Sequence, residues 1–64
     1  MIIVFVTSHD KVVSFNPEQV IVEIGEYDET QKRIELKGFY NTTTHLVSLG
    51  EAAKIEKRLR EAWK

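Results

Sequence analysis

The sequence predicts an α+β protein in which an antiparallel, twisted sheet of four or five strands is followed by one C-terminal helix. Two features of the chain lead to this prediction. Residues 1–47 contain short apolar runs separated by turn residues, which is typical of strands joined by hairpins. Residues 48–64 instead repeat apolar side chains at the spacing of an amphipathic helix. We therefore expect the order β-β-β-β-β-α within a single domain, residues 1–64.

The first two strands form a predicted hairpin. Residues 2–7 carry apolar side chains on both faces, which favours a strand that is covered on both sides. Residues 8–11 are turn residues, and residues 12–15 pair back as the second strand. Asn16 and Pro17 then indicate one short helical turn, because asparagine can cap a helix and proline presets φ for its first position.

A second hairpin is predicted from the alternation of apolar and polar residues at positions 20–25 and 33–37, with a polar turn at residues 28–31 between them. Residues 39–47 leave two interpretations open. Their ends are apolar, but their centre, which includes Asn41, is polar. The segment is either a last strand at the edge of the sheet, with a bulge or loop near Asn41, or an irregular loop.

The C-terminal helix begins at a capping box. The hydroxyl of Ser48 can accept a hydrogen bond from the first turn, and Glu51 can reach back to the N–H of Ser48. The apolar stripe is roughly 100° wide, as expected for a helix that packs on a core. The residues of this stripe are Ala52, Ile55, Leu59, Ala62 and Trp63.

The opposite side of the predicted helix is basic. This candidate interaction surface could contact phosphates or an acidic protein, and the alternative is a solvated face that complements the helix dipole. Trp63 also has two interpretations: it closes the end of the core, which we expect, or it anchors a partner protein. The candidate surface consists of Lys54, Lys57, Arg58, Arg60 and Lys64, with Trp63 beside them.

No pattern in the chain predicts an enzyme, a metal site or a cofactor. His9 and Asp10 are adjacent, but serine and aspartate favour a tight turn there. Similarly, His45 is expected to be hydrogen-bonded or to face solvent. A group of four acidic residues does not follow the Asp-x-Asp-x-Asp-Gly spacing of a calcium-binding loop. We expect this group to be a solvated hairpin tip. The group consists of Glu23, Glu26, Asp28 and Glu29.

Composition limits the classes of partner. The net charge is −1, and the charges are unevenly divided: residues 1–47 carry four bases and seven acids, whereas residues 48–64 carry five bases and three acids. There are no cysteines, so disulfides cannot support the fold. The apolar run at residues 2–6 is too short for a signal peptide or a membrane span, so we expect a cytoplasmic protein without membrane contact.

The chain resembles the small FlbD-type proteins associated with flagella and swarming motility, and related short bacterial and phage proteins. The resemblance consists of the segment FNPEQVIVEI at residues 15–24, together with Ile34, Leu36, Gly38, Val47 and Glu51. It implies a small regulatory or accessory factor without catalytic residues. Residues 39–45 depart from it, because they are longer than the compact hairpin of those proteins.

From these observations we expect a small, non-enzymatic regulatory or accessory protein of a bacterium or phage that acts through protein–protein binding. One helix can cover only one face of a sheet, so the other face should bind a second copy of the chain or a partner protein. The alternative function is a small nucleic-acid-binding regulator that uses the basic face of the helix.

Overall fold

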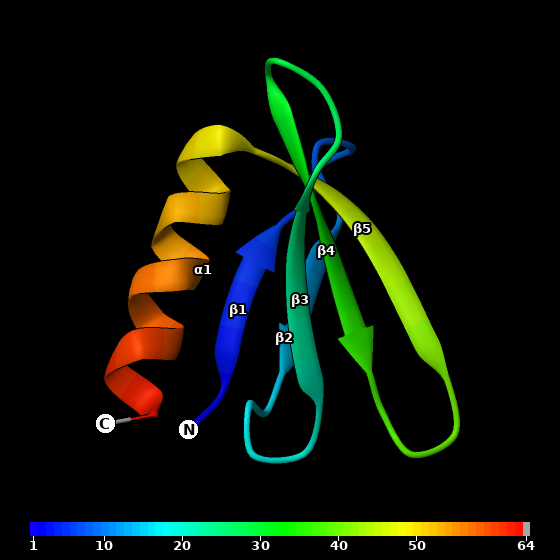
Figure 1. The fold of residues 1–64 in the computed structure, drawn as a ribbon, viewed down its shortest axis with the longest axis vertical. Coiled ribbons are helices and arrows are strands. Elements are labelled where there is room, and N and C mark those ends of the chain that lie inside the picture. The colour runs from blue at the N-terminus through cyan, green and yellow to red at the C-terminus, as the bar shows by residue number, and fades with distance from the viewer. Residues whose placement is uncertain (64) are drawn as a thin grey trace.

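The computed structural model describes residues 1–63 and confirms the α+β class and the predicted order of elements (Figure 1). It corrects the number of sheets. The strands form two antiparallel sheets, one with the order β1-β2 and one with the order β3-β4-β5, instead of one sheet of four or five strands. The elements are β1 (Ile3–Val6), β2 (Val12–Phe15), β3 (Ile21–Glu26), β4 (Gln31–Lys37), β5 (Thr42–Ser48) and α1 (Leu49–Ala62).

The β1–β2 hairpin closes through the predicted turn. Asp10 adopts a left-handed conformation with φ of 62°, which aspartate tolerates better than most residues. Its N–H donates to the carbonyl of Thr7 (3.0 Å), and the N–H of Thr7 donates to the carbonyl of Lys11 (2.8 Å). The hydroxyl of Thr7 also accepts from the N–H groups of His9 and Lys11. His9 and Asp10 therefore serve the turn, as the sequence predicts.

The segment after β2 is a single turn at the predicted residues, and it does not continue into a regular helix. The Asn16 side chain accepts from the N–H of Glu18 (2.9 Å), and the N–H of Gln19 donates to the carbonyl of Asn16 (2.9 Å). An asparagine that bonds the backbone two residues ahead stabilises a turn as effectively as it caps a helix. The chain then starts the second sheet instead of extending the first.

The three-stranded sheet resolves the ambiguity at residues 39–47. The N–H of Gly38 donates to the carbonyl of Asn41 (2.8 Å), which closes a short turn. From Thr42 onward the chain is a regular strand that pairs with β4 in an unbroken register from Lys37↔Thr42 to Gln31↔Ser48. The polar threonines that made this strand hard to recognise lie on the exposed half of β5.

The core lies between the two sheets and α1, which packs against β1, β4 and β5. In Figure 1, α1 runs along one side of the molecule next to β1. The rings of Phe5 and Phe15 meet edge to face, with centroids 6.1 Å apart. The buried apolar residues are Ile3, Phe5, Phe15, Ile34, Leu36, Val47, Ala52, Ile55 and Leu59.

The start of α1 confirms half of the predicted capping box. The hydroxyl of Ser48 accepts from the N–H of Glu51 (3.2 Å). The Glu51 carboxylate turns to the first sheet instead of returning to Ser48, and accepts from the N–H of Val6 at 3.4 Å. The helix start is thereby connected to the end of β1.

Candidate interaction surfaces

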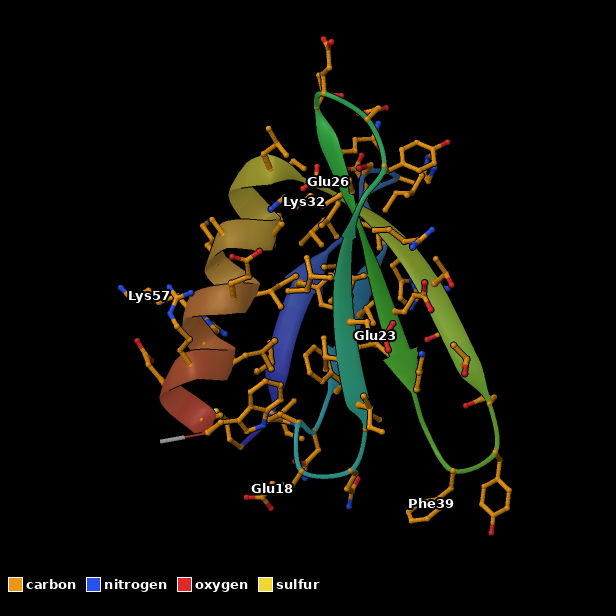
Figure 2. The ribbon with its side chains drawn as sticks, viewed as in Figure 1. Glu18, Glu23, Glu26, Lys32, Phe39 and Lys57 are labelled. Atoms are coloured by element: carbon orange, nitrogen blue, oxygen red, sulfur yellow. The ribbon has the colours of Figure 1, made fainter. Side chains whose placement is uncertain are left out.

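The described basic residues of α1 are exposed on the side of the helix that faces away from the buried Ala52, Ile55 and Leu59. Lys54 pairs with Glu51 at 3.8 Å, whereas Lys57, Arg58 and Arg60 form no ion pair within residues 1–63. Lys57 projects away from both sheets in Figure 2. Lys64 lies outside the described residues.

Two grooves flank the helix, and some of these basic side chains line each of them. Lys54 and Arg58 line a groove of about 160 Å³ between α1 and β1, together with Val4 and Val6. Arg60 lines a different groove of about 290 Å³ between α1 and β3. Arg58 and Arg60 therefore lie on opposite flanks of the exposed side of α1, and the role of this surface in binding stays a prediction.

Trp63 lies in the second groove, next to Arg60 and the half-buried side chains Val22 and Ile24. It is 56% exposed, so the prediction that it closes the core is wrong. The backbone explains its position. Trp63 follows the last helical residue, and its N–H still donates to the carbonyl of Leu59 (3.0 Å) while its φ leaves the helical range.

The outer face of the β1–β2 sheet is apolar and open to solvent. The inward side chains of β1, Ile3 and Phe5, are buried, and its outward side chains alternate with them. Within this chain one face of the strand is covered, and the covering of its other face by a second copy or a partner stays a prediction. The exposed fractions are 58% for Ile2, 49% for Val4, 39% for Val6 and 67% for Val12. We call these four residues the outer β1–β2 face.

A further exposed site was missed by the sequence analysis. Phe39 and Tyr40 lie in the turn between β4 and β5, and Phe39 is 96% exposed. Figure 2 shows Phe39 at the end of the molecule where Glu18 also lies. A groove of about 310 Å³ lies beside them, lined by Ile21, Gln19 and Lys37 among others. The signal that could have revealed this site is an aromatic pair enclosed by Gly38 and Asn41, two residues that favour turns.

The acidic group does not converge on one point. Glu23 lies within β3 and accepts a hydrogen bond from Lys37 (2.8 Å), which raises the pKa of Lys37. Glu26 pairs with Lys32 at 3.9 Å. Asp28 accepts from the N–H groups of Thr30 and Gln31, and these bonds lower its pKa. Only the last part of the group thus forms the predicted hairpin tip. Within residues 1–63, no three His, Asp or Glu side chains are placed to hold a metal ion.

His45 is partly buried against the core and has a hydrogen-bond partner, as the sequence predicts. Its ring meets that of Phe5 edge to face at 5.8 Å, and its Nε2 lies 3.2 Å from the hydroxyl of Thr43. Burial lowers the pKa of His45, and the charge of Lys11 lowers it further. His45 therefore contributes to the packing of β5 on β1.

No family model, curated protein or solved structure matches this chain. The resemblance to the FlbD-type proteins stays a prediction. In the described part of the chain, no helix has the length and apolar character needed to cross a membrane.

Proposed function

We propose that this chain is a small, non-enzymatic regulatory or accessory protein of a bacterium or phage that acts in the cytoplasm through protein–protein binding. The observation that carries this proposal is the outer β1–β2 face. Four aliphatic side chains on one face of a short hairpin are 39% to 67% exposed. Contiguous apolar surface on the order of several hundred Å² usually marks an interaction site on a soluble protein.

The occupant that we propose for this face is a second copy of the chain. A 64-residue domain buries a smaller fraction of its surface than a large domain does, so it gains more from an added interface. Two copies related by a twofold axis place the same face against itself, which matches aliphatic side chains with aliphatic side chains. A stable interface buries on the order of 800 Å² per partner, so the outer β1–β2 face would form its centre and polar residues such as Ser14 its rim.

We expect Val12→Glu to convert the dimer into a monomer, because a charge at the centre of an apolar interface loses its hydration without gaining a partner. The measurement is light scattering on a size-exclusion column at micromolar concentration, with a monomer mass of 7.4 kDa as reference. Ile21→Glu is the matched control, since Ile21 lies in the other sheet and is 66% exposed, compared with 67% for Val12.

Three results would contradict a dimer that forms through the outer β1–β2 face. The wild-type protein could elute at the monomer mass, its melting curve could be independent of concentration, or Ile21→Glu could disrupt association as strongly as Val12→Glu. In the last case the contact would not involve the outer β1–β2 face.

A second candidate function, binding of nucleic acid through α1, is favoured by one observation. Lys57, Arg58 and Arg60 are exposed and form no ion pair within residues 1–63. Lysine and arginine side chains of this kind neutralise phosphates and supply most of the affinity in complexes that do not read sequence.

If this second function holds, Lys57→Glu combined with Arg58→Glu should abolish a gel shift with DNA or RNA and leave the circular dichroism spectrum unchanged. The spectrum should persist because both side chains are exposed and outside the core. A complex based on phosphate contacts also weakens steeply as salt is added. If the wild-type protein shifts neither nucleic acid at low salt, this function is excluded.

A further inference from the structure

β3 is an edge strand that has a hydrogen-bonded neighbour on one side only. In the order β3-β4-β5, all six residues of β3 pair with β4, from Ile21↔Lys37 to Glu26↔Lys32. Within residues 1–63 no other strand pairs with β3, and α1 packs mainly on β1, β4 and β5. Alternate residues of an edge strand direct their N–H and C=O groups away from the sheet, so β3 presents unpaired backbone groups on the side away from β4.

The apolar core is incompletely covered where it reaches β3. In β4, Ile34 and Leu36 are buried. Ile24 and Val22, which pair with them in β3 and face the same side of the sheet, are only half-buried. The groove of about 290 Å³ between α1 and β3 lies beside these two side chains, and Trp63 lines it as well. The free edge of β3 therefore borders a groove with apolar walls.

Charged side chains often protect an edge strand from pairing with another chain, but those near this edge bond within the sheet. Glu23 turns toward β4 (Figure 2), and its carboxylate accepts from Lys37 at 2.8 Å. On β4 itself, Arg33 pairs with Glu35 at 3.0 Å. These ion pairs hold the charges over the sheet and leave the backbone groups of β3 accessible.

The groove itself contains one charge that the described residues do not neutralise. Glu56 pairs with Lys32 at 3.5 Å, whereas Arg60 forms no ion pair within residues 1–63. A guanidinium binds a carboxylate through two parallel hydrogen bonds. The groove therefore suits a ligand that combines apolar side chains with a carboxylate.

We propose that an extended segment of a partner protein adds as a strand to the free edge of β3. Its alternate apolar side chains enter the groove between α1 and β3, and a carboxylate pairs with Arg60. The backbone of the segment lies beside β3 at about 4.8 Å, so only side chains have to fit in the groove. Main-chain hydrogen bonds supply the affinity, and the side chains in the groove supply the specificity. This inference rests on the proposed function as a protein binder, but it uses no residue of the outer β1–β2 face.

A second copy fits this edge less well than a partner segment. β3 contains two acidic residues, Glu23 and Glu26, and no basic residue. Two copies that paired through β3 would bring these acidic residues together, and like charges on adjacent strands are destabilising. A second self-complementary interface, in addition to the outer β1–β2 face, would also link the copies into open-ended chains instead of a closed dimer.

The test is a titration of the full chain with a short synthetic peptide of alternating valine and threonine that has glutamate at both ends, so that a carboxylate is available in either strand direction. Trp63 is the only tryptophan of the chain and lines the groove, so its fluorescence reports on binding there. We expect its emission to move to shorter wavelength as the peptide excludes water. Amide hydrogen exchange in β3 should slow at the residues whose N–H groups point away from β4. The same peptide with a fully N-methylated backbone should not bind, because it cannot donate main-chain hydrogen bonds.

Two charge variants test the role of Arg60. Arg60→Glu should weaken binding by about tenfold or more, since it replaces an attractive charge by a repulsive one. Lys57→Glu makes the same change in net charge, but Lys57 lines none of the three grooves, so the affinity should stay within about twofold. Both residues are exposed, so neither variant disturbs the core.

Four outcomes would overturn the proposal. The peptide could leave the emission of Trp63 unchanged, or the N-methylated peptide could bind equally well, which would show side-chain binding without an added strand. Equal losses for the Arg60 and Lys57 variants would show non-specific charge attraction. If exchange in β3 is already slow in the free protein and becomes faster on dilution, a second copy occupies the edge.

The dimer is measured separately by light scattering, so the two proposals can fail independently. A dimer that does not bind the peptide contradicts only this inference. A monomer that binds the peptide contradicts only the dimer.

Discussion

Phe5→Ala is expected to lower the free energy of unfolding by about 3–5 kcal/mol, the usual cost of truncating a fully buried phenylalanine. Phe5 is 1% exposed and belongs to the core. It meets Phe15 of β2 and His45 of β5, so its ring joins the two sheets. Removing it leaves a cavity where the sheets meet, and the loss is comparable to the total stability of many small domains. Urea unfolding followed by circular dichroism measures the change.

Phe39→Ala is the matched control for this prediction. Phe39 is the same residue type, but its side chain is 96% exposed in the turn between β4 and β5. Its truncation should change the free energy of unfolding by less than about 0.5 kcal/mol. If the two variants unfold at similar urea concentrations, Phe5 does not occupy the position that joins the sheets.

Leu59→Ala should cost about 2–4 kcal/mol, because Leu59 is central to the buried stripe of α1 and is 5% exposed. Leu49→Ala, at the first residue of the same helix, is the control, since Leu49 is 44% exposed. Thermal melts of the two variants at equal concentration give the comparison. A melt of Leu59→Ala close to that of the wild-type protein would contradict the packing of α1 on the core.

Much of the fold could be predicted from local sequence. The Ser48 cap, the buried positions Ala52, Ile55 and Leu59, and the turn at His9 and Asp10 all depend on residues close together in the chain. Interactions at short sequence separation leave a pattern that spacing and residue type reveal. The element order therefore followed from the sequence, and so did the existence of the helix.

The candidate site was predicted less well, because it depends on distant segments. The sequence placed Lys54, Arg58 and Arg60 on one helix, but the positions of β1 and β3 decide which groove each side chain lines. Lys64 lies outside the described residues. Phe39 was not predicted, since an aromatic residue in an uncertain segment is more often assigned to a core strand than to an exposed turn.

The sequence by itself determined that this protein has at least four short strands, a capped helix with one apolar stripe, and a first strand that is apolar on both faces. The tertiary structure alone decided how the strands are distributed. The tight turn at Asn16 starts a second sheet, so β1 has a partner on one edge only. The pairing of strands depends on which distant backbone segments meet. The spacing of residues along the chain does not predict these meetings. For this reason the division of the strands between two sheets became visible only in the folded molecule.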